Sequence, residues 1–468
     1  MGASALFGLL AFRSIGRFHR QVSDAVPASA IECSNVLSIP VMRACHCFLI
    51  FAALLLSTQA ASAENQPNIV LILSDYMGYH DSEPYGATDL RTPQLSRLAA
   101  EGVRMTNFYA ASPVCGPARA ALYTGQYPAR IGFEKNIRSE SDGLSSSVPS
   151  LPRWLNDAGY QTALFGKWHL GYAEDFTPNA HGFDEFFGHH QWTIGYYNHK
   201  TEQGEPGLYE NDRLVDRDGY LTDLLTREAV EFIANNKQRP FFLTLSYNAA
   251  LPPYQPPGLP ESEWDKGWDV NEATRADYVG MVERMDEGIG EVLDALDTHD
   301  LTANTLVIYL YDHGGRHLVN SAPLFHGFAT LWEGGIRIPL IMRLPGIIRE
   351  NQVVHRPGIA MDITATILDV AGLKDKTIGL DGISLMPGLL EESSLPDRPL
   401  YWRANLYNFG EQKAVRDGQY KYLVHGSTQF LFDLDADESE RENLFTRLPE
   451  DVDRLRNMLV NWESKLPK

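Results

Sequence analysis

Four short apolar runs mark the chain, and each ends in polar or glycine-rich residues. None shows the alternation of a half-exposed strand, and each is short for a helix. Continuous apolar runs of this length are typical of strands buried on both faces of a largely parallel sheet. The runs are Asn68–Ser74, Gln161–Phe165, Phe241–Tyr247 and Thr305–Tyr311. The pattern therefore predicts that these segments form the centre of one sheet.

A helical repeat precedes the last run, with apolar residues at three- and four-residue steps. They are Tyr278, Met281, Val282, Met285, Ile289, Val292, Leu293 and Leu296. Strands alternating with helices indicate an α/β fold, in which ligands bind beyond the carboxyl ends of the strands. Polar residues follow all four runs, at Asp75, Gly166–His169, Asn248 and Asp312–Gly315. We expect these polar segments to share one site.

The pattern changes after about Leu389. Residues 391–396 (EESSLP) have the composition of a linker, and short runs separated by turns then predict a small antiparallel sheet. Those runs are Pro399–Arg403, Ala414–Arg416, Tyr420–Val424 and Phe430–Asp433, followed by a helix over Asp451–Leu466. We therefore expect a large α/β domain over residues 64–390 and a smaller α+β domain over residues 391–468.

The first 63 residues contain the parts of an export signal in the usual order. Arg43 precedes the apolar run Cys47–Leu56, and the small residues Ala61–Ala63 stand before Glu64. The apolar run is too short to span a bilayer, which takes about 20 residues. We expect an upstream extension before Met42, cleavage after Ala63, no stable membrane span, and a periplasmic or secreted protein.

Composition narrows the possible functions. The 468 residues are 44% hydrophobic and 11% aromatic, which suits a globular protein with a full core and disfavours bulk disorder. Sixty acidic residues against 40 basic ones give a net charge of −20, so non-specific nucleic-acid binding is disfavoured. An anionic substrate would need a local basic pocket. Only Cys115 of the four cysteines follows the predicted leader, which excludes an intrachain disulfide in the exported chain.

Cys115 begins a segment with the features of a helix start. Pro117 suits the first helical turn, where its missing N–H costs nothing, and Ala120–Tyr123 has good helix propensity. The free amides and the dipole of a helix N-terminus favour negative charge. Arg119, one turn further, can point back to the same place. The segment therefore predicts a site for an anionic group beside the thiol.

These residues carry a family resemblance. The pattern Cys115-x-Pro117-x-Arg119, followed by Thr124-Gly125 and Tyr127-Pro128-x-Arg130, resembles the signature of the formylglycine-dependent, arylsulfatase-like sulfatases. Further similar blocks occur in order at residues 67–81, 92–110, 164–171, 181–188, 331–341 and 431–444. The resemblance implies an alkaline-phosphatase-like α/β fold, with a large mixed, mostly parallel sheet flanked by helices and a smaller C-terminal α+β domain.

The resemblance also implies a chemistry. A formylglycine-generating enzyme would convert Cys115 to formylglycine, and the aldehyde would be hydrated to a diol. One hydroxyl attacks sulfur and expels the alcohol, and loss of the proton from the other hydroxyl releases inorganic sulfate. One divalent cation per site, usually Ca²⁺ in this family, holds the diol and the sulfate oxygens.

Site residues follow from the same resemblance. Asp75, Cys115, Asp312 and His313 match the metal-binding positions. Arg119 matches the residue that steadies the diol and the metal cluster. Lys167 and His169 match the pair that contacts sulfate, and His169 is the candidate base for sulfate release. The expected substrate is a small-molecule or glycan sulfate ester.

Three positions depart from the family pattern. Tyr76 stands where a second aspartate is usual, and a phenol is a weak ligand for a hard cation. Leu251 replaces a histidine that contacts sulfate and can protonate the leaving oxygen, and Phe328 replaces a lysine. General acid catalysis contributes typically about 10²–10⁴-fold, so these departures put the activity in doubt.

Three functions are consistent with these residues. In the first, the protein is a slower sulfatase or one biased towards aryl esters, with His317 or His326 replacing a missing group. In the second, it is a catalytically impaired pseudo-sulfatase that binds sulfated glycans. In the third, it hydrolyses phosphate or phosphonate esters, although such enzymes more often have Ser or Thr at the position of Cys115. The retained Cys115 and Arg119, with the cations and carboxylates above, favour sulfate ester hydrolysis. The natural substrate and the oligomeric state are left open.

Overall fold

The computed structural model describes residues 66–467 except 138, 140, 391–394 and 407. The predicted extension, signal and cleavage site at residues 1–63 lie outside the described residues. Within the described part of the chain, every helix is too short or too polar to cross a bilayer.

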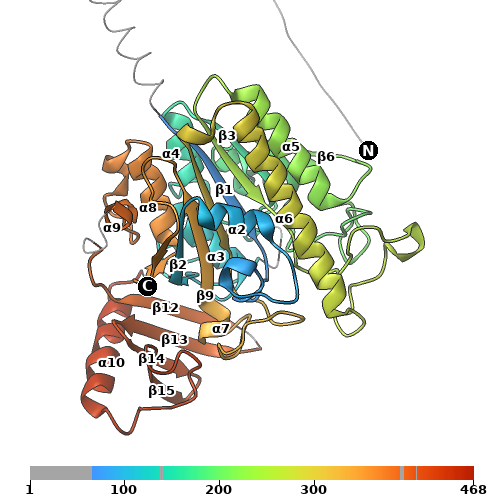
Figure 1. The fold of residues 1–468 in the computed structure, drawn as a ribbon. Coiled ribbons are helices and arrows are strands. Elements are labelled where there is room, and N and C mark those ends of the chain that lie inside the picture. The colour runs from blue at the N-terminus through green and yellow to red at the C-terminus, as the bar shows by residue number, and fades with distance from the viewer. Residues whose placement is uncertain (1–65, 138, 140, 391–394, 407, 468) are drawn as a thin grey trace, which may run out of the picture. The chain divides into compact units, whose positions relative to one another are not determined.

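The large sheet has eleven strands (Figure 1). They are β1 (Asn68–Ser74), β2 (Val103–Tyr109), β3 (Gln161–Lys167), β4 (Glu185–His189), β5 (Tyr209–Glu210), β6 (Arg213–Leu214), β7 (Phe241–Ser246), β8 (Thr305–Tyr311), β9 (Arg337–Arg343), β10 (Gln352–Val354) and β11 (Gly358–Ile359). Their order is β10-β2-β9-β8-β1-β7-β3-β4-β5-β6, and β11 lies outside this order and pairs with β2. Most pairs are parallel, while β9 is antiparallel to both neighbours. The predicted mixed, mostly parallel sheet is confirmed.

The register of the central strands brings their carboxyl ends together. Ser74 of β1 pairs with Tyr311 of β8, and Leu73 pairs with Ser246 of β7. The residues that follow these strands therefore leave the sheet at the same edge. The predicted limits of β1 and β8 are correct. Strand β3 is two residues longer than predicted, because Gly166 and Lys167 still pair with β4, so Lys167 is held on the sheet and not on a loop.

Helices cover both faces of this sheet (Figure 1). Helices α2 (Pro93–Ala100) and α5 (Leu221–Asn236) both contact α6 (Arg275–Thr298), while α3 (Cys115–Thr124), α4 (Leu151–Asp157) and α8 (Met361–Val370) contact one another. Helix α6 confirms the predicted helical repeat. Its start is fixed by a capping box in which Thr274 and Asp277 satisfy each other's backbone N–H. The shorter helices are α7 (Glu333–Ile336) and α9 (Met386–Leu390).

The C-terminal part forms the predicted antiparallel sheet. Its strands are β12 (Leu400–Leu406), β13 (Gly410–Asp417), β14 (Tyr420–His425) and β15 (Thr428–Asp433), paired in chain order. Helix α10 (Pro449–Glu463) contacts β13 and β14. The buried Trp402 joins this sheet to the larger one, because its Nε1 donates to the Ala110 carbonyl at 2.8 Å. The domain boundary between residues 390 and 391 stays a prediction.

Candidate active site

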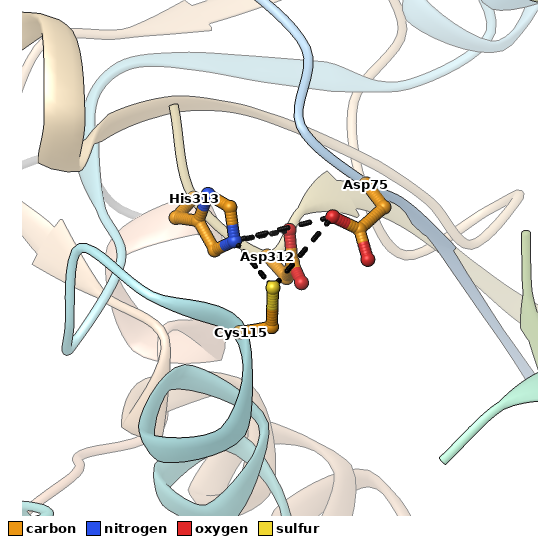
Figure 2. A group of neighbouring side chains, drawn as sticks. All are labelled: Asp75, Cys115, Asp312 and His313. Atoms are coloured by element: carbon orange, nitrogen blue, oxygen red, sulfur yellow. Dashed lines mark hydrogen bonds and ion pairs between the residues drawn. The ribbon is translucent and has the colours of Figure 1, made fainter. Parts of the chain in front are cut away.

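Cys115 is the first residue of α3, as the sequence indicated. Val114 before it is extended, with φ −141° and ψ 151°, and the helix runs on through Pro117. The Cys115 side chain is a buried, free thiol. In Figure 2 it points from the helix start towards Asp75, Asp312 and His313. The topology thus brings a thiol from a helix N-terminus to the polar edge of the central strands.

Four side chains meet at this point (Figure 2). One donor atom each from Asp75, Cys115, Asp312 and His313 lies within 4.8 Å of the others. His313 Nε2 is 3.0 Å from Cys115 Sγ and 3.5 Å from Asp312 Oδ1. Asp75 Oδ1 is 3.9 Å from Cys115 Sγ and 3.9 Å from His313 Nε2. We call these four residues the donor cluster, and they are the four that the sequence predicted as metal ligands.

Arg119 fixes the carboxylates of the donor cluster. Its Nη2 is 3.1 Å from Asp75 Oδ2 and its Nε is 3.1 Å from Asp312 Oδ2. Its Nη1 donates to the Lys167 carbonyl at 2.9 Å and to Ser246 Oγ at 2.7 Å. Lys167 Nζ lies 2.5 Å from Asp75 Oδ2. Both cations are fully buried, and each pairs with an Oδ2 atom. The Oδ1 atom of Asp75 lies 3.9 Å from Cys115 Sγ, and that of Asp312 lies 3.5 Å from His313 Nε2.

Burial and neighbouring charges set the two carboxylates apart. Burial would raise the pKa of Asp75, but Lys167 and Arg119 outweigh it and hold that pKa below its ordinary value. Burial together with the charge of Asp75 raises the pKa of Asp312. Asp312 Oδ1 is buried and has no hydrogen-bond partner among the described residues. A buried oxygen without a donor is costly, which makes this corner of the site suited to a cation.

The two histidines have opposite protonation behaviour. Burial would lower the pKa of His313, but Asp312, Cys115 and Asp75 raise it to about 10. Burial, Lys167 and Arg119 lower the pKa of His169 well below 6.5. His169 Nδ1 is buried without a hydrogen-bond partner among the described residues. His169 is therefore neutral at neutral pH and able to accept a proton.

Two of the three departures from the family pattern lie side by side. The Tyr76 and Phe328 ring centroids are 5.1 Å apart, and those of Phe328 and His313 are also 5.1 Å apart. The Tyr76 ring is edge-on to the His313 ring, with ring centroids 6.2 Å apart. Tyr76 has φ 60°, and burial raises the pKa of its phenol, which therefore stays neutral. The aromatic pair covers His313 where the family pattern has a carboxylate and an ammonium group.

The third departure lies on a segment bonded to Asp75. The Asp75 N–H donates to the Ala249 carbonyl, and the Ala250 N–H donates back to the Asp75 carbonyl, both at 2.9 Å. Leu251 follows in this segment and is 3% exposed. The Leu251 carbonyl accepts a hydrogen bond from the Tyr196 hydroxyl at 3.1 Å. Its side chain offers the site no proton. The segment thus holds the backbone of Asp75 without adding an acid.

Sequence reasoning missed two polar residues here. Ser246, the last residue of β7, accepts from Arg119 and donates to the Lys167 carbonyl at 2.8 Å. His189 ends β4 beside Lys167 in register, and its buried Nε2 has no hydrogen-bond partner among the described residues. Burial and Lys167 lower the pKa of His189 to about 3. Both could have been found from their positions at strand ends.

The two histidines that the sequence offered as substitutes are placed differently. His317 and His326 are both exposed. The His326 ring packs against the rings of Phe325 and Trp332, with ring centroids 4.3 Å and 5.3 Å apart, respectively. The His317 carbonyl accepts from the Tyr254 hydroxyl at 3.2 Å. A catalytic role for either imidazole stays a prediction.

Comparison with known proteins agrees with this geometry. A family model described as Sulfatase matches residues 67–373, and one described as N-sulphoglucosamine sulphohydrolase, C-terminal, matches residues 325–464. The N-acetylgalactosamine-6-sulfatase of Rattus norvegicus is 35% identical over 394 residues, which cover 77% of this chain and 72% of that protein. Arylsulfatase J of Mus musculus is 29% identical, and the match covers 85% of this chain and 76% of that protein.

Solved structures share the fold. Ps i-CgsB in complex with k-i-k-neocarrahexaose has a TM-score of 0.77 and 30% identity, covering 85% of this chain and 93% of that one. The phosphonate monoester hydrolase of Agrobacterium radiobacter, at 20% identity, has a TM-score of 0.64, with 86% and 96% covered. That likeness shows the fold alone. The arrangement around Cys115, the family models and the similar proteins together place this chain in the sulfatase family.

Proposed function

We propose that this chain hydrolyses sulfate esters at the Cys115 centre, after conversion of Cys115 to formylglycine by a formylglycine-generating enzyme. The observation that carries the proposal is the surroundings of the Cys115 side chain. It lies at a helix N-terminus, next to two carboxylates and an imidazole, with Arg119 and Lys167 behind them. Membership of the sulfatase family supports the same chemistry.

The donor cluster fits a divalent cation, for which the family favours Ca²⁺. Asp75 and Asp312 each direct one carboxylate oxygen into the cluster. Asp312 Oδ1 has no hydrogen-bond donor among the described residues, and a bound cation would take the place of such a donor. His313 adds a nitrogen ligand, and residue 115 adds its own side chain. When bound, the cation would offset negative charge on the sulfate oxygens.

The remaining polar side chains have separate tasks in this proposal. Arg119 and Lys167 orient the carboxylates and attract the anionic ester, because both are buried cations beside the same site. His169 accepts a proton during sulfate release, which its depressed pKa permits at neutral pH. The carbonyl of Lys167, bonded to Arg119 and Ser246, keeps the end of β3 in place.

The proposed substrate is a sulfated saccharide or a related small sulfate ester. The relative named N-acetylgalactosamine-6-sulfatase and the neighbour bound to k-i-k-neocarrahexaose support a saccharide. We also propose that the protein is exported, as periplasmic or secreted, after cleavage near Ala63. Its net charge of −20 argues against a nucleic-acid substrate.

A sulfated-glycan-binding protein with little turnover is the second candidate. It is favoured by Tyr76, Leu251 and Phe328, which remove a ligand, an acid and a cation from the family pattern. Such a protein would keep Arg119 and Lys167 for anion binding. A phosphate or phosphonate ester hydrolase is the third candidate, and only the fold likeness to the phosphonate monoester hydrolase supports it.

One set of assays separates the three candidates. The chain is co-expressed with a formylglycine-generating enzyme, its intact mass is recorded, and it is supplied with Ca²⁺. Turnover is then measured on matched aryl sulfate and aryl phosphate esters, and binding of a sulfated oligosaccharide is measured by calorimetry. The Cys115→Ala variant is the control. Sulfate turnover that this variant lacks supports the proposal, whereas conversion without sulfate turnover contradicts it. Phosphate turnover or binding alone would identify the other candidates.

A further inference from the structure

We propose that the chain as encoded, with Cys115 still a thiol, binds a zinc-type cation in four-coordinate geometry through Asp75, Cys115, Asp312 and His313, in preference to Ca²⁺. This inference concerns the unconverted protein. It therefore stands or falls independently of the sulfate ester hydrolysis proposed above, which requires conversion of the same residue.

The spacing of the donor atoms fits a small tetrahedral ion. Zn²⁺ binds sulfur at about 2.3 Å, nitrogen at about 2.0–2.1 Å and carboxylate oxygen at about 2.0–2.2 Å, so its ligand atoms lie roughly 3.4–3.6 Å apart. Four of the six separations among Asp75 Oδ1, Cys115 Sγ, Asp312 Oδ1 and His313 Nε2 are 3.0, 3.5, 3.9 and 3.9 Å. These four values lie on either side of the tetrahedral spacing, and the donor atoms of the cluster all lie within 4.8 Å of one another.

The three ligands other than Cys115 are each also oriented by a contact at their second polar atom. Asp75 Oδ2 is held by Lys167 and Arg119, and Asp312 Oδ2 is held by Arg119. His313 Nδ1 lies 3.0 Å from the Gly314 carbonyl and donates to it, so Nε2 becomes the ligand atom when the cation displaces its proton. Outer contacts of this kind orient the ligands of zinc sites. The cluster therefore has an outer layer as well as four inner donors.

The chemistry of the donors disfavours Ca²⁺. Calcium takes six to eight oxygen ligands, whereas this group offers a sulfur, a nitrogen and two carboxylates. Thiolate and imidazole suit Zn²⁺. At the next position after Asp75, where the family pattern has a further carboxylate, the Tyr76 ring packs against Phe328. Asp312 Oδ1 is buried and has no hydrogen-bond partner among the described residues, so a cation in the cluster would satisfy it.

Binding has a chemical consequence for Cys115. The Cys115 thiol and the His313 Nε2 each release a proton to solvent as the metal–sulfur and metal–nitrogen bonds form, with no change of oxidation state. A sulfur atom held by the metal is shielded from an added thiol reagent. We therefore expect Zn²⁺ to slow alkylation of Cys115 by iodoacetamide.

The test uses the full chain expressed without a formylglycine-generating enzyme, with the thiol verified by intact mass. After removal of metal by a chelator, the protein is titrated with Co²⁺, which reports coordination in its absorption spectrum. We expect one equivalent to bind, with intense tetrahedral bands and a thiolate-to-cobalt charge-transfer band. One equivalent of Zn²⁺ should remove these bands, and excess Ca²⁺ should leave them.

Two variants separate the proposal from general metal binding. Cys115→Ser should lose the charge-transfer band, while His190→Asn, a buried histidine outside the donor cluster, should keep it. Zinc-edge X-ray absorption of the wild-type protein gives an answer even if a variant fails to fold. One sulfur with three nitrogen or oxygen ligands supports the proposal. Six oxygen ligands, or displacement of Co²⁺ by Ca²⁺, would overturn it.

Discussion

The rings of Tyr76 and Phe328 are in contact, with centroids 5.1 Å apart. These two residues occupy positions where the sulfatase pattern has a carboxylate and an ammonium group. Because one lost charge is negative and the other positive, the pair of departures leaves the formal charge of the site unchanged. Both rings also flank His313. Two of the three departures are therefore one local replacement of two opposite charges by a pair of aromatic rings in contact.

This contact predicts energetic coupling between the two positions. Tyr76→Asp or Phe328→Lys alone places one charge against an aromatic ring, and each should lower the free energy of unfolding by about 0.5–3 kcal/mol. The double variant should recover part of that loss, with a coupling of about 0.5–3 kcal/mol. A double-mutant cycle by chemical denaturation measures it. Strictly additive losses would contradict the contact.

The third departure predicts a change in substrate dependence. Adding Leu251→His to the double variant supplies a proton donor, so turnover of an alkyl sulfate should rise, by up to about 10²-fold. An aryl sulfate should gain much less, because a phenolate leaves without a proton. Steady-state kinetics on the two esters tests this. Equal gains on both esters would show that residue 251 does not protonate the leaving oxygen.

Arg119 should be essential to stability as well as to activity. It is fully buried and contacts Asp75, Asp312, the Lys167 carbonyl and Ser246. Arg119→Met leaves buried carboxylates without their partner, which should cost about 3–5 kcal/mol. Thermal and chemical unfolding of this variant measures the loss.

The matched control is Arg97, which also pairs with several carboxylates but is 29% exposed. Arg97→Met should cost less than about 1 kcal/mol because exposed pairs are weak. Similar losses for the two variants would contradict the assignment of Arg119 as the buried centre of the site.

The sequence predicted the parts of this structure that depend on local pattern. Buried strands such as Asn68–Ser74 and Thr305–Tyr311 have continuous apolar runs, so their limits were correct. The end of β3 was misplaced because Gly166 and Lys167 are neither apolar nor β-forming, yet they pair with β4. Strand pairing, and not propensity, extends that strand.

The site was predictable only where the family pattern marks it. The motif identified Cys115 and Arg119, and the strand ends identified Asp75 and Asp312. The contact between Tyr76 and Phe328 could not be predicted, because side chains distant in sequence meet only through the tertiary fold. Ser246 stands at a strand end, which was a usable signal, but its partner could not be predicted, because it depends on which side chain reaches it.

His169 predicts the acid side of the pH profile. Burial, Lys167 and Arg119 lower its pKa well below 6.5, so it stays a base until the solution is much more acidic than for an ordinary histidine. The acid limb of kcat should therefore lie well below pH 6.5. His169→Asn should lower kcat by about 10²–10⁴-fold and remove that limb. An unchanged limb in the variant would assign the titration to another group.

A buried charge cluster between α7 and the small sheet predicts a pH dependence of stability. Lys421 Nζ is 2.8 Å from Glu333 and 2.9 Å from Glu440. Burial raises the pKa of Glu440 from 4.5 to about 7, despite Lys421. The folded chain then holds a proton that the unfolded chain has released, so stability falls as pH rises from about 4.5 through about 7.

The comparison with Glu440→Gln isolates this contribution, because the variant has no proton to lose. Unfolding free energies of the two proteins are measured by denaturant between pH 4 and pH 8, and the wild type should lose stability relative to the variant as the pH rises. Parallel pH curves for the two proteins would contradict the raised pKa of Glu440.

The most direct measurement relates conversion of residue 115 to sulfate release. Preparations made with graded amounts of formylglycine-generating enzyme are digested, and mass spectrometry of the peptide containing residue 115 gives the converted fraction. Inorganic sulfate released from a sulfate ester is measured on the same samples. Turnover should rise in proportion to the converted fraction and vanish in Cys115→Ala. Full conversion without sulfate release, or equal release from unconverted chains, would contradict the account.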